Sequence, residues 1–167
     1  MNSGLILISR IEDLAAVRRL GVVCGLEDSG RDDEQIEAAW GAFDGERLVG
    51  ALVLERNQGL ETVNWMAVDG EYRRRGIASR LYGVLEREAL ARGIARLWVT
   101  ARNPGFFLWQ GYETVAEGDE RDILLGECPN CAQFGHGCEP RALTKRIDHS
   151  GPPDGPPSEG ETWPDRD

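Results

Sequence analysis

The stretch Val68-Asp69-Gly70-Glu71-Tyr72-Arg73-Arg74-Arg75-Gly76-Ile77-Ala78-Ser79 is the most informative part of this sequence of 167 residues. It lies between a predicted strand, Glu61–Val68, and a predicted amphipathic helix, Gly76–Arg92. The start of a helix presents backbone N–H groups and partial positive charge, so it readily binds phosphate. Gly76 and Ala78 add little bulk there, and three arginines add positive charge. The pattern matches neither G-x-G-x-x-G nor the P-loop. A solvated charge cluster before an ordinary helix is the alternative interpretation.

Strands and helices alternate on both sides of this stretch. The Asp44-Gly45 dipeptide predicts a hairpin turn, and Asn103-Pro104 predicts a helix start with Asn103 as the N-cap. Strands are predicted at Leu5–Ser9, Gly41–Phe43, Leu48–Arg56, Glu61–Val68, Arg96–Thr100, Tyr112–Ala116 and Ala142–Ile147, and helices at Glu12–Gly25, Asp32–Trp40, Gly76–Arg92 and Phe106–Gln110. The order β-α-α-β-β-β-α-β-α-β-β predicts an α/β fold around a mixed sheet.

The chain is acidic, with 29 acidic and 19 basic residues and a formal net charge of −10. Such a chain repels phosphate backbones, so we expect no general nucleic-acid binding. No apolar run is long enough to cross a membrane, and Met1–Arg10 lacks the basic start of a signal peptide. We therefore expect a cytoplasmic protein with no membrane partner, in which the cysteines form no structural disulfides.

Two stretches stand outside the alternating pattern. Residues 149–167 are rich in proline, glycine and acidic residues and lack apolar periodicity, which predicts a disordered tail. The remaining residues, 1–148, are predicted to form one domain with a Cys-rich insertion at about 126–141.

The insertion contains a possible zinc-binding pattern. Cys128 and Cys131 form a C-x₂-C pair, and His136 and Cys138 could complete a tetrahedral zinc site, with Cys24 as a competing ligand. The alternative is an irregular excursion with reduced, partly buried cysteines, because a second pair with zinc-finger spacing is missing. A redox role is less favoured, since nothing places the pair at a βα turn. Cys24, on an apolar helix face, is expected in the core.

Two landmarks resemble the GNAT superfamily of acetyl-CoA-dependent N-acetyltransferases. The segment Arg73–Ala78 fits its [Q/R]-x-x-G-x-[G/A] motif, and Val68 opens the typical V-x-x-x-Y-R lead-in. Residues Arg102–Tyr112 resemble the second landmark, a loop asparagine before a short helix that ends in F-[YF]-x-x-x-G-[FY]. The double phenylalanine resembles amino-acid acetyltransferases of the N-acetylglutamate synthase type. The resemblance implies a mixed, mostly antiparallel central sheet flanked by helices.

The resemblance also implies where acetyl-CoA binds. The strand residues Met66, Ala67 and Val68 would pair with the pantetheine arm, and a backbone N–H there would polarise the thioester carbonyl. Asn103 would lie near the thiol. Arg73 belongs to the motif, and the pyrophosphate would be held by the backbone N–H groups of Arg74, Arg75, Gly76, Ile77, Ala78 and Ser79.

The catalytic groups depart from the family pattern. An amine is mostly protonated at neutral pH, so a base is useful. Family members often place a glutamate where this chain has Asn64, which can orient a water but cannot act as a base. Glu61 is the nearest carboxylate, although an exposed strand-end acid is an equally good interpretation. Phe107 replaces the usual proton-donating tyrosine, which leaves Tyr72, Tyr82, a water or unassisted departure of the thiolate.

These features predict an enzyme that transfers acetyl from acetyl-CoA to a primary amine of a small molecule, by direct attack in a ternary complex. Asn64 and Phe107 suggest a rival, a non-catalytic acyl-CoA-binding or sensor domain on the same fold. A second rival is a zinc-stabilised interaction module built on the cysteine segment and the acidic tail. Acetylation of a protein lysine and assembly into a homodimer both stay open.

Overall fold

The computed structural model describes residues 4–26, 33–102, 104–126, 128 and 133–147. These residues belong to two compact units. One unit comprises Met1–Glu55 and Asn64–Glu88, and the other comprises Arg56–Val63 and Ala89–Asp167. Strand β4 contributes its first half to the second unit and its second half to the first. The first unit therefore contains the whole stretch that carries the anion-binding pattern, Val68–Ser79.

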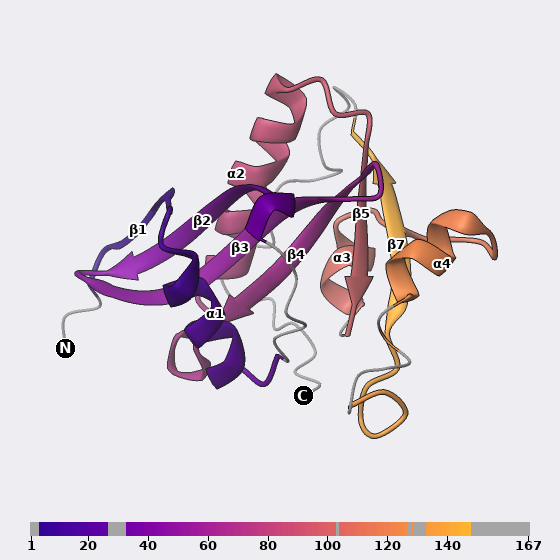
Figure 1. The fold of residues 1–167 in the computed structure, drawn as a ribbon. Coiled ribbons are helices and arrows are strands. Elements are labelled where there is room, and N and C mark those ends of the chain that lie inside the picture. Colours follow the sequence, from indigo (N-terminus) through magenta and orange to yellow (C-terminus); the bar gives the residue numbers. More distant parts are fainter. Residues whose placement is uncertain (1–3, 27–32, 103, 127, 129–132, 148–167) are drawn as a thin grey trace. The chain divides into compact units, whose positions relative to one another are not determined.

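The described strands form a seven-stranded sheet with the hydrogen-bonded order β1-β2-β3-β4-β5-β7-β6. The β1–β2, β2–β3, β5–β7 and β6–β7 pairs are antiparallel, and β4 and β5 run parallel. The strands are β1 (Ile6–Arg10), β2 (Ile36–Asp44), β3 (Arg47–Asn57), β4 (Leu60–Val68), β5 (Arg96–Ala101), β6 (Glu113–Thr114) and β7 (Arg141–Arg146), and the helices are α1 (Leu14–Val23), α2 (Ile77–Ala91), α3 (Gly105–Trp109) and α4 (Asp119–Leu125). The mixed, mostly antiparallel sheet with flanking helices confirms the predicted fold class (Figure 1).

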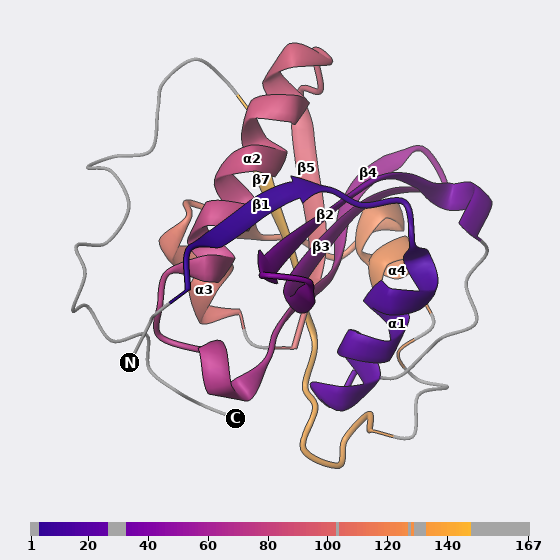
Figure 2. The ribbon, with the colours of Figure 1, turned by 90° about the vertical axis from the view of Figure 1, so that its left-hand side faces the viewer.

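In the first unit, α1 and α2 cover opposite faces of β2 and β3 (Figure 2). Alternate residues of β3 face the two helices, as the two-residue period of a strand requires. Ala51 and Val53 belong to the cluster that packs against α1, whereas a Cβ at Gly50 would meet Ile77 and Leu81 of α2. Because both faces are covered, Val49–Glu55 is buried without interruption.

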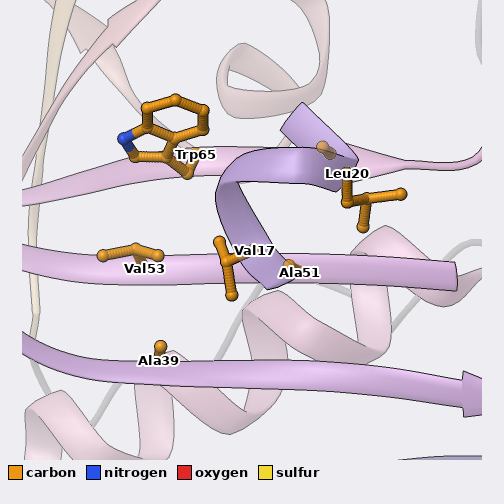
Figure 3. Close-up of a cluster of buried hydrophobic side chains, with 7 residues drawn as sticks. Val17, Leu20, Ala39, Ala51, Val53 and Trp65 are labelled. Atoms are coloured by element: carbon orange, nitrogen blue, oxygen red, sulfur yellow. The ribbon is translucent and has the colours of Figure 1, made fainter. Parts of the chain in front are cut away.

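The cluster under α1 joins that helix to three strands (Figure 3). Val17 and Leu20 point from the helix towards Ala39, Ala51, Val53 and Trp65. Asp13 caps the helix, since its Oδ1 accepts a hydrogen bond from Ala16 N at 3.1 Å. The buried side chains of the cluster are Val17, Leu20, Ala39, Ala51, Val53, Trp65 and Ala67.

The predicted helix over Asp32–Trp40 is wrong. A short 3₁₀ helix, Asp33–Gln35, is followed at once by β2, so the observed order has a single α-helix between β1 and β2. Glutamate and alanine favour a helix by intrinsic propensity. However, the segment pairs with β1 on one side and β3 on the other, and Ala38, Ala39 and Trp40 are consecutively buried. Strand pairing and burial on both faces override the local preference.

In the second unit, β5 and β7 form the longest ladder, from Arg96–Arg146 to Ala101–Arg141. The ladder between β4 and β5 pairs Thr62 with Trp98 and Val63 with Val99. Helix α4 is absent from the sequence prediction. It follows Gly118, carries acidic residues in its first turn as the helix dipole favours, and ends where Thr100 Oγ1 donates to Leu124 O at 2.7 Å.

Candidate functional site

The second half of β4 departs from regular strand geometry. Trp65 has a φ of +51°, in the left-handed region that a bulky residue rarely adopts. Its backbone N–H donates to Asn64 Oδ1 at 2.9 Å, and its ring lies so close to Gly21 of α1 that a Cβ at position 21 would overlap it. Trp65 and Ala67 are buried, whereas Met66 and Val68 are partly exposed. Asn64 and Gly21 therefore accommodate a bend immediately before the three residues predicted to contact pantetheine.

The loop after β4 is tied to the β2–β3 hairpin by several hydrogen bonds. Asp69 N donates to Val49 O at 2.8 Å, and the Asp69 carboxylate accepts from Arg47 at 3.0 Å. Tyr72 Oη donates to Asp44 Oδ2 at 2.7 Å. Asp69 also caps the short 3₁₀ helix Gly70–Tyr72 by accepting from Glu71 N at 3.0 Å. The hydrogen bond to Asp44 raises the pKa of Tyr72, and partial burial acts in the same direction.

Two of the three arginines reach back to carbonyls of their own loop. Arg73 Nε donates to Val68 O at 3.3 Å, and Arg75 donates to Glu71 O at 3.3 Å. The Arg75 guanidinium also lies 4.9 Å from the centre of the Tyr72 ring. Arg74 and Gly76 both have left-handed backbone, with φ of +65° and +73°. The chain therefore turns sharply just before α2.

The first turn of α2 has the features of an anion site. Arg80 N is bonded to Gly76 O at 3.1 Å, so the amides of Ile77–Ser79 precede the regular helical ladder. A Cβ at Gly76 would meet no atom within 4 Å, so the backbone there borders open space. Ser79 Oγ is buried and has no hydrogen-bond partner among the described residues. Backbone amides, an unused hydroxyl and neighbouring arginines can together hold a phosphate.

Cys24 packs against the α1 cluster, as expected for a core cysteine, and it also lies beside this loop, a contact that the sequence did not indicate. Its Sγ is 3.5 Å from Val68 O, the carbonyl that also accepts from Arg73. Burial raises the pKa of the Cys24 thiol, and the positive charge of Arg73 offsets part of that effect. The helical spacing placed Cys24 near the apolar face of α1. Nothing in the local sequence indicated that α1 ends against the loop between β4 and α2, which carries Arg73, Arg74 and Arg75 and is called the arginine loop below.

Glu61 lies in the second unit, at the start of β4. Its Oε1 accepts from Arg56 Nε at 3.0 Å and from a second Arg56 nitrogen at 2.5 Å. The Glu61 side chain is only 13% exposed, and its Oε2 is buried without a hydrogen-bond partner among the described residues. Glu61 is therefore a largely buried, ion-paired carboxylate near the start of its strand, and not the exposed acid of the alternative interpretation.

Phe107 offers no route for proton transfer. It is 5% exposed and packs edge-on against Phe106 and Tyr112, with ring centres 5.2 Å apart in both pairs. Of the two tyrosines considered instead, Tyr82 is 2% exposed, and Tyr72 already donates its hydroxyl proton to Asp44. Phe107 therefore has a packing role in the core.

The predicted zinc ligands and one cofactor position are only partly described. Asn103 and Cys131 lie outside the described residues, and Pro104 occupies the N-cap position of α3. Within the described part of the chain, no group of three or more His, Cys, Asp or Glu side chains could hold a metal ion. His136 is exposed, and Cys128 and Cys138 are partly buried.

The first unit thus brings together most of the predicted cofactor residues, together with two that the sequence did not indicate. Asp44 and Arg47 flank the predicted Asp-Gly turn, and both bind the arginine loop. Within the same unit lie Asn64, Met66, Ala67, Val68, Arg73, Arg74, Arg75, Gly76, Ile77, Ala78 and Ser79. Among the described residues, no helix is long and apolar enough to cross a membrane.

Comparison with known proteins finds a family whose model covers the region of this site. The model of the acetyltransferase (GNAT) family matches residues 12–112, which include all of the first unit after α1 begins. No curated protein matches the sequence.

Solved structures share the fold at low sequence identity. The ribosomal-protein-S18-alanine N-acetyltransferase from Escherichia coli has a TM-score of 0.66 at 16% identity, over 88% of this chain and 97% of that one. Rv2747 from Mycobacterium tuberculosis, solved with CoA and NLQ, has a TM-score of 0.63 at 14% identity, over 85% and 99%. The N-acetylglutamate synthase from Neisseria gonorrhoeae, solved with coenzyme A and N-acetyl-glutamate, has a TM-score of 0.60 at 18% identity, over 88% of this chain and 36% of that one.

Proposed function

Because the chain belongs to the GNAT family of acetyltransferases, we propose that it transfers the acetyl group of acetyl-CoA to a primary amine of a small molecule. An amino acid is the first class to test. The amine would attack directly in a ternary complex. Acetyl-CoA supplies an acetyl group activated as a thioester, and the residues of this chain bind it, orient the amine and handle the proton.

The start of α2 is the observation that carries the proposal. Gly76 combines a left-handed φ of +73° with open space where a side chain would stand. The buried Ser79 hydroxyl has no partner among the described residues, so it can donate a hydrogen bond to a phosphate oxygen. The amides of Ile77–Ser79 add donors and the helix dipole. These groups fit the diphosphate of coenzyme A, and this basic loop contrasts with the acidic chain around it.

We assign proton abstraction to Glu61, directly or through a water. Glu61 Oε2 is a carboxylate oxygen without a hydrogen-bond partner among the described residues, whereas Oε1 accepts from Arg56. Asn64 cannot take up a proton, and its Oδ1 already accepts from Trp65 N. Glu61→Gln should therefore lower turnover and leave the affinity for coenzyme A unchanged.

A non-catalytic acyl-CoA-binding domain is the second candidate. It is favoured by the packing of Phe107 and by the structural use of Asn64, since neither offers a proton-transfer group. Release of free thiol from acetyl-CoA in the presence of amines separates the candidates. The panel should contain amino acids, polyamines, a peptide with an N-terminal alanine and a lysine peptide.

Amine-dependent thiol release, with acetylated product identified by mass spectrometry, is the expected result. Tight binding of coenzyme A without thiol release from any amine would favour the sensor. Release only with the peptides would replace the small-molecule acceptor by a protein. The cytoplasmic location and a homodimer remain predictions that fractionation and sedimentation would test.

A further inference from the structure

We propose that the turn between β2 and β3 is a clamp that holds the coenzyme-binding loop in its binding conformation. The clamp consists of Asp44 and Arg47 on the hairpin, and of Asp69 and Tyr72 on the loop. All four residues lie in the first unit. The inference rests on the proposed binding of coenzyme A, and it makes Asp44 and Tyr72 positioning residues for that ligand.

The register of the hairpin places the two holding side chains at its tip. Asp44 pairs directly with Arg47 across a two-residue turn in which Gly45 has a φ of +59°. From one side of the turn, Asp44 accepts from Tyr72 Oη at 2.7 Å. From the other side, Arg47 donates to Asp69 at 3.0 Å and lies 5.3 Å from the centre of the Tyr72 ring. One rigid turn therefore fixes both ends of the 3₁₀ helix in the loop.

The loop needs such support because its next residues are strained. Arg74 has a φ of +65°, which costs free energy for a residue with a side chain and persists only where the surroundings enforce it. Tyr72 lies two residues before Arg74, and its hydroxyl ties this end of the loop to the hairpin. If the tie is lost, Arg74 can relax towards ordinary backbone, and the amides that follow it lose their common direction. Affinity for a diphosphate then falls because the free loop must be ordered on binding.

The charges of the clamp show that it is not itself a phosphate site. Arg47 also contacts Glu71 at 3.3 Å, so its single positive charge faces the carboxylates of Asp69 and Glu71. Asp44 adds a further negative charge beside the Tyr72 hydroxyl. The group therefore acts on the coenzyme through the backbone of the loop and not through direct attraction.

Titration calorimetry with coenzyme A, combined with thermal unfolding of each full-length variant, tests the clamp. Tyr72→Phe keeps the ring but removes the hydroxyl, and Asp44→Ala removes its acceptor. Each should weaken binding of coenzyme A by about 10- to 150-fold, as expected for loss of one hydrogen bond to a charged group. The double variant should bind about as well as either single variant, because both remove the same interaction. Asp44→Asn retains an acceptor oxygen and should restore most of the affinity.

Glu88→Gln is the control, since it removes the surface ion pair with Arg10 and lies in α2, outside the four residues of the clamp. Its affinity should equal that of the wild type. The clamp is overturned if Tyr72→Phe and Asp44→Ala are folded at the temperature of measurement and bind coenzyme A as the wild type does, even with a lower Tm. It is also overturned if the two changes weaken binding additively. If the wild type itself does not bind coenzyme A, the proposed function fails first, and the inference fails with it.

Discussion

Strand β4 pairs regularly in its first half and bends in its second half. Thr62 and Val63 form ordinary ladder pairs with β5, and Glu61 is fixed by an ion pair with its near neighbour Arg56. At Trp65 the backbone turns into the left-handed region, supported by Asn64 and by the missing side chain of Gly21. The first half has the regular strand geometry that the apolar pattern of the sequence predicts. The second half depends on a glycine in a different element, and it leads into the loop that we assign to the coenzyme.

The largest expected effect on stability comes from filling the space at Gly21. Gly21→Ala would place a Cβ inside the contact distance of the Trp65 ring, so the bend must shift. We expect the free energy of unfolding to fall by about 2 kcal/mol, as for overpacking of a core. Denaturant unfolding measures this change.

The matched control is Gly83→Ala in α2, where a Cβ would meet no atom within 4 Å. That change should stabilise the protein by about 0.5–1 kcal/mol, because alanine is the better helix former. Equal effects at the two glycines would show that the bend at Trp65 does not depend on close approach of α1.

A smaller effect on stability is expected from changes at Asn64, and it tests what supports the bent second half of β4. Asn64→Ala removes the acceptor of the Trp65 N–H and should cost about 1 kcal/mol of unfolding free energy. Asn64→Asp keeps an acceptor oxygen and should cost less. If alanine and aspartate were equally destabilising, the hydrogen bond to the bent backbone would not be the reason for an asparagine here.

The smallest expected effect is a pH dependence of stability that arises from the ionisation of Tyr72. Its pKa in the folded state is raised above the ordinary value of 10.0, mainly by the hydrogen bond to Asp44. This contribution to stability is fully present below the pKa of the unfolded chain, and it is lost as the pH rises through the folded-state pKa. Between about pH 9 and pH 11, the wild type should therefore lose more stability than Tyr72→Phe. Parallel pH profiles of the two proteins would contradict the assignment.

The loop and its helix could be predicted from the sequence because their signals are local. Gly76, Ala78 and the arginines lie within a few residues of each other, between a strand and a long helix with clear periodicity. Short-range signals also predicted α1 and β5. Glu61 was identified from the sequence as the nearest carboxylate on its strand. Its ion pair with Arg56 was not predicted, because it crosses a hairpin whose register cannot be read from the sequence.

The errors occurred where distant segments decide the structure. Ile36–Trp40 contains good helix formers, yet pairing with β1 and β3 makes it a strand. The partners of the loop, Asp44 and Arg47, are more than 20 residues away from it in sequence. Their roles became visible only when the hairpin register placed both at one turn. Cys24 packs against the α1 cluster, but its contact with Val68 could not be predicted because the two residues are 44 positions apart.

The central claim is that the start of α2 holds the diphosphate of coenzyme A. Calorimetric titration of coenzyme A into the wild type, Gly76→Glu and Gly59→Glu tests it directly. Both glycines have a positive φ and open space around the Cβ position, so the two variants share the strain and the added charge. Like charges at close range cost several kcal/mol, so Gly76→Glu should bind at least about 100-fold more weakly than the wild type. Gly59→Glu should bind as the wild type does. Binding of coenzyme A by Gly76→Glu with unchanged affinity would contradict the account.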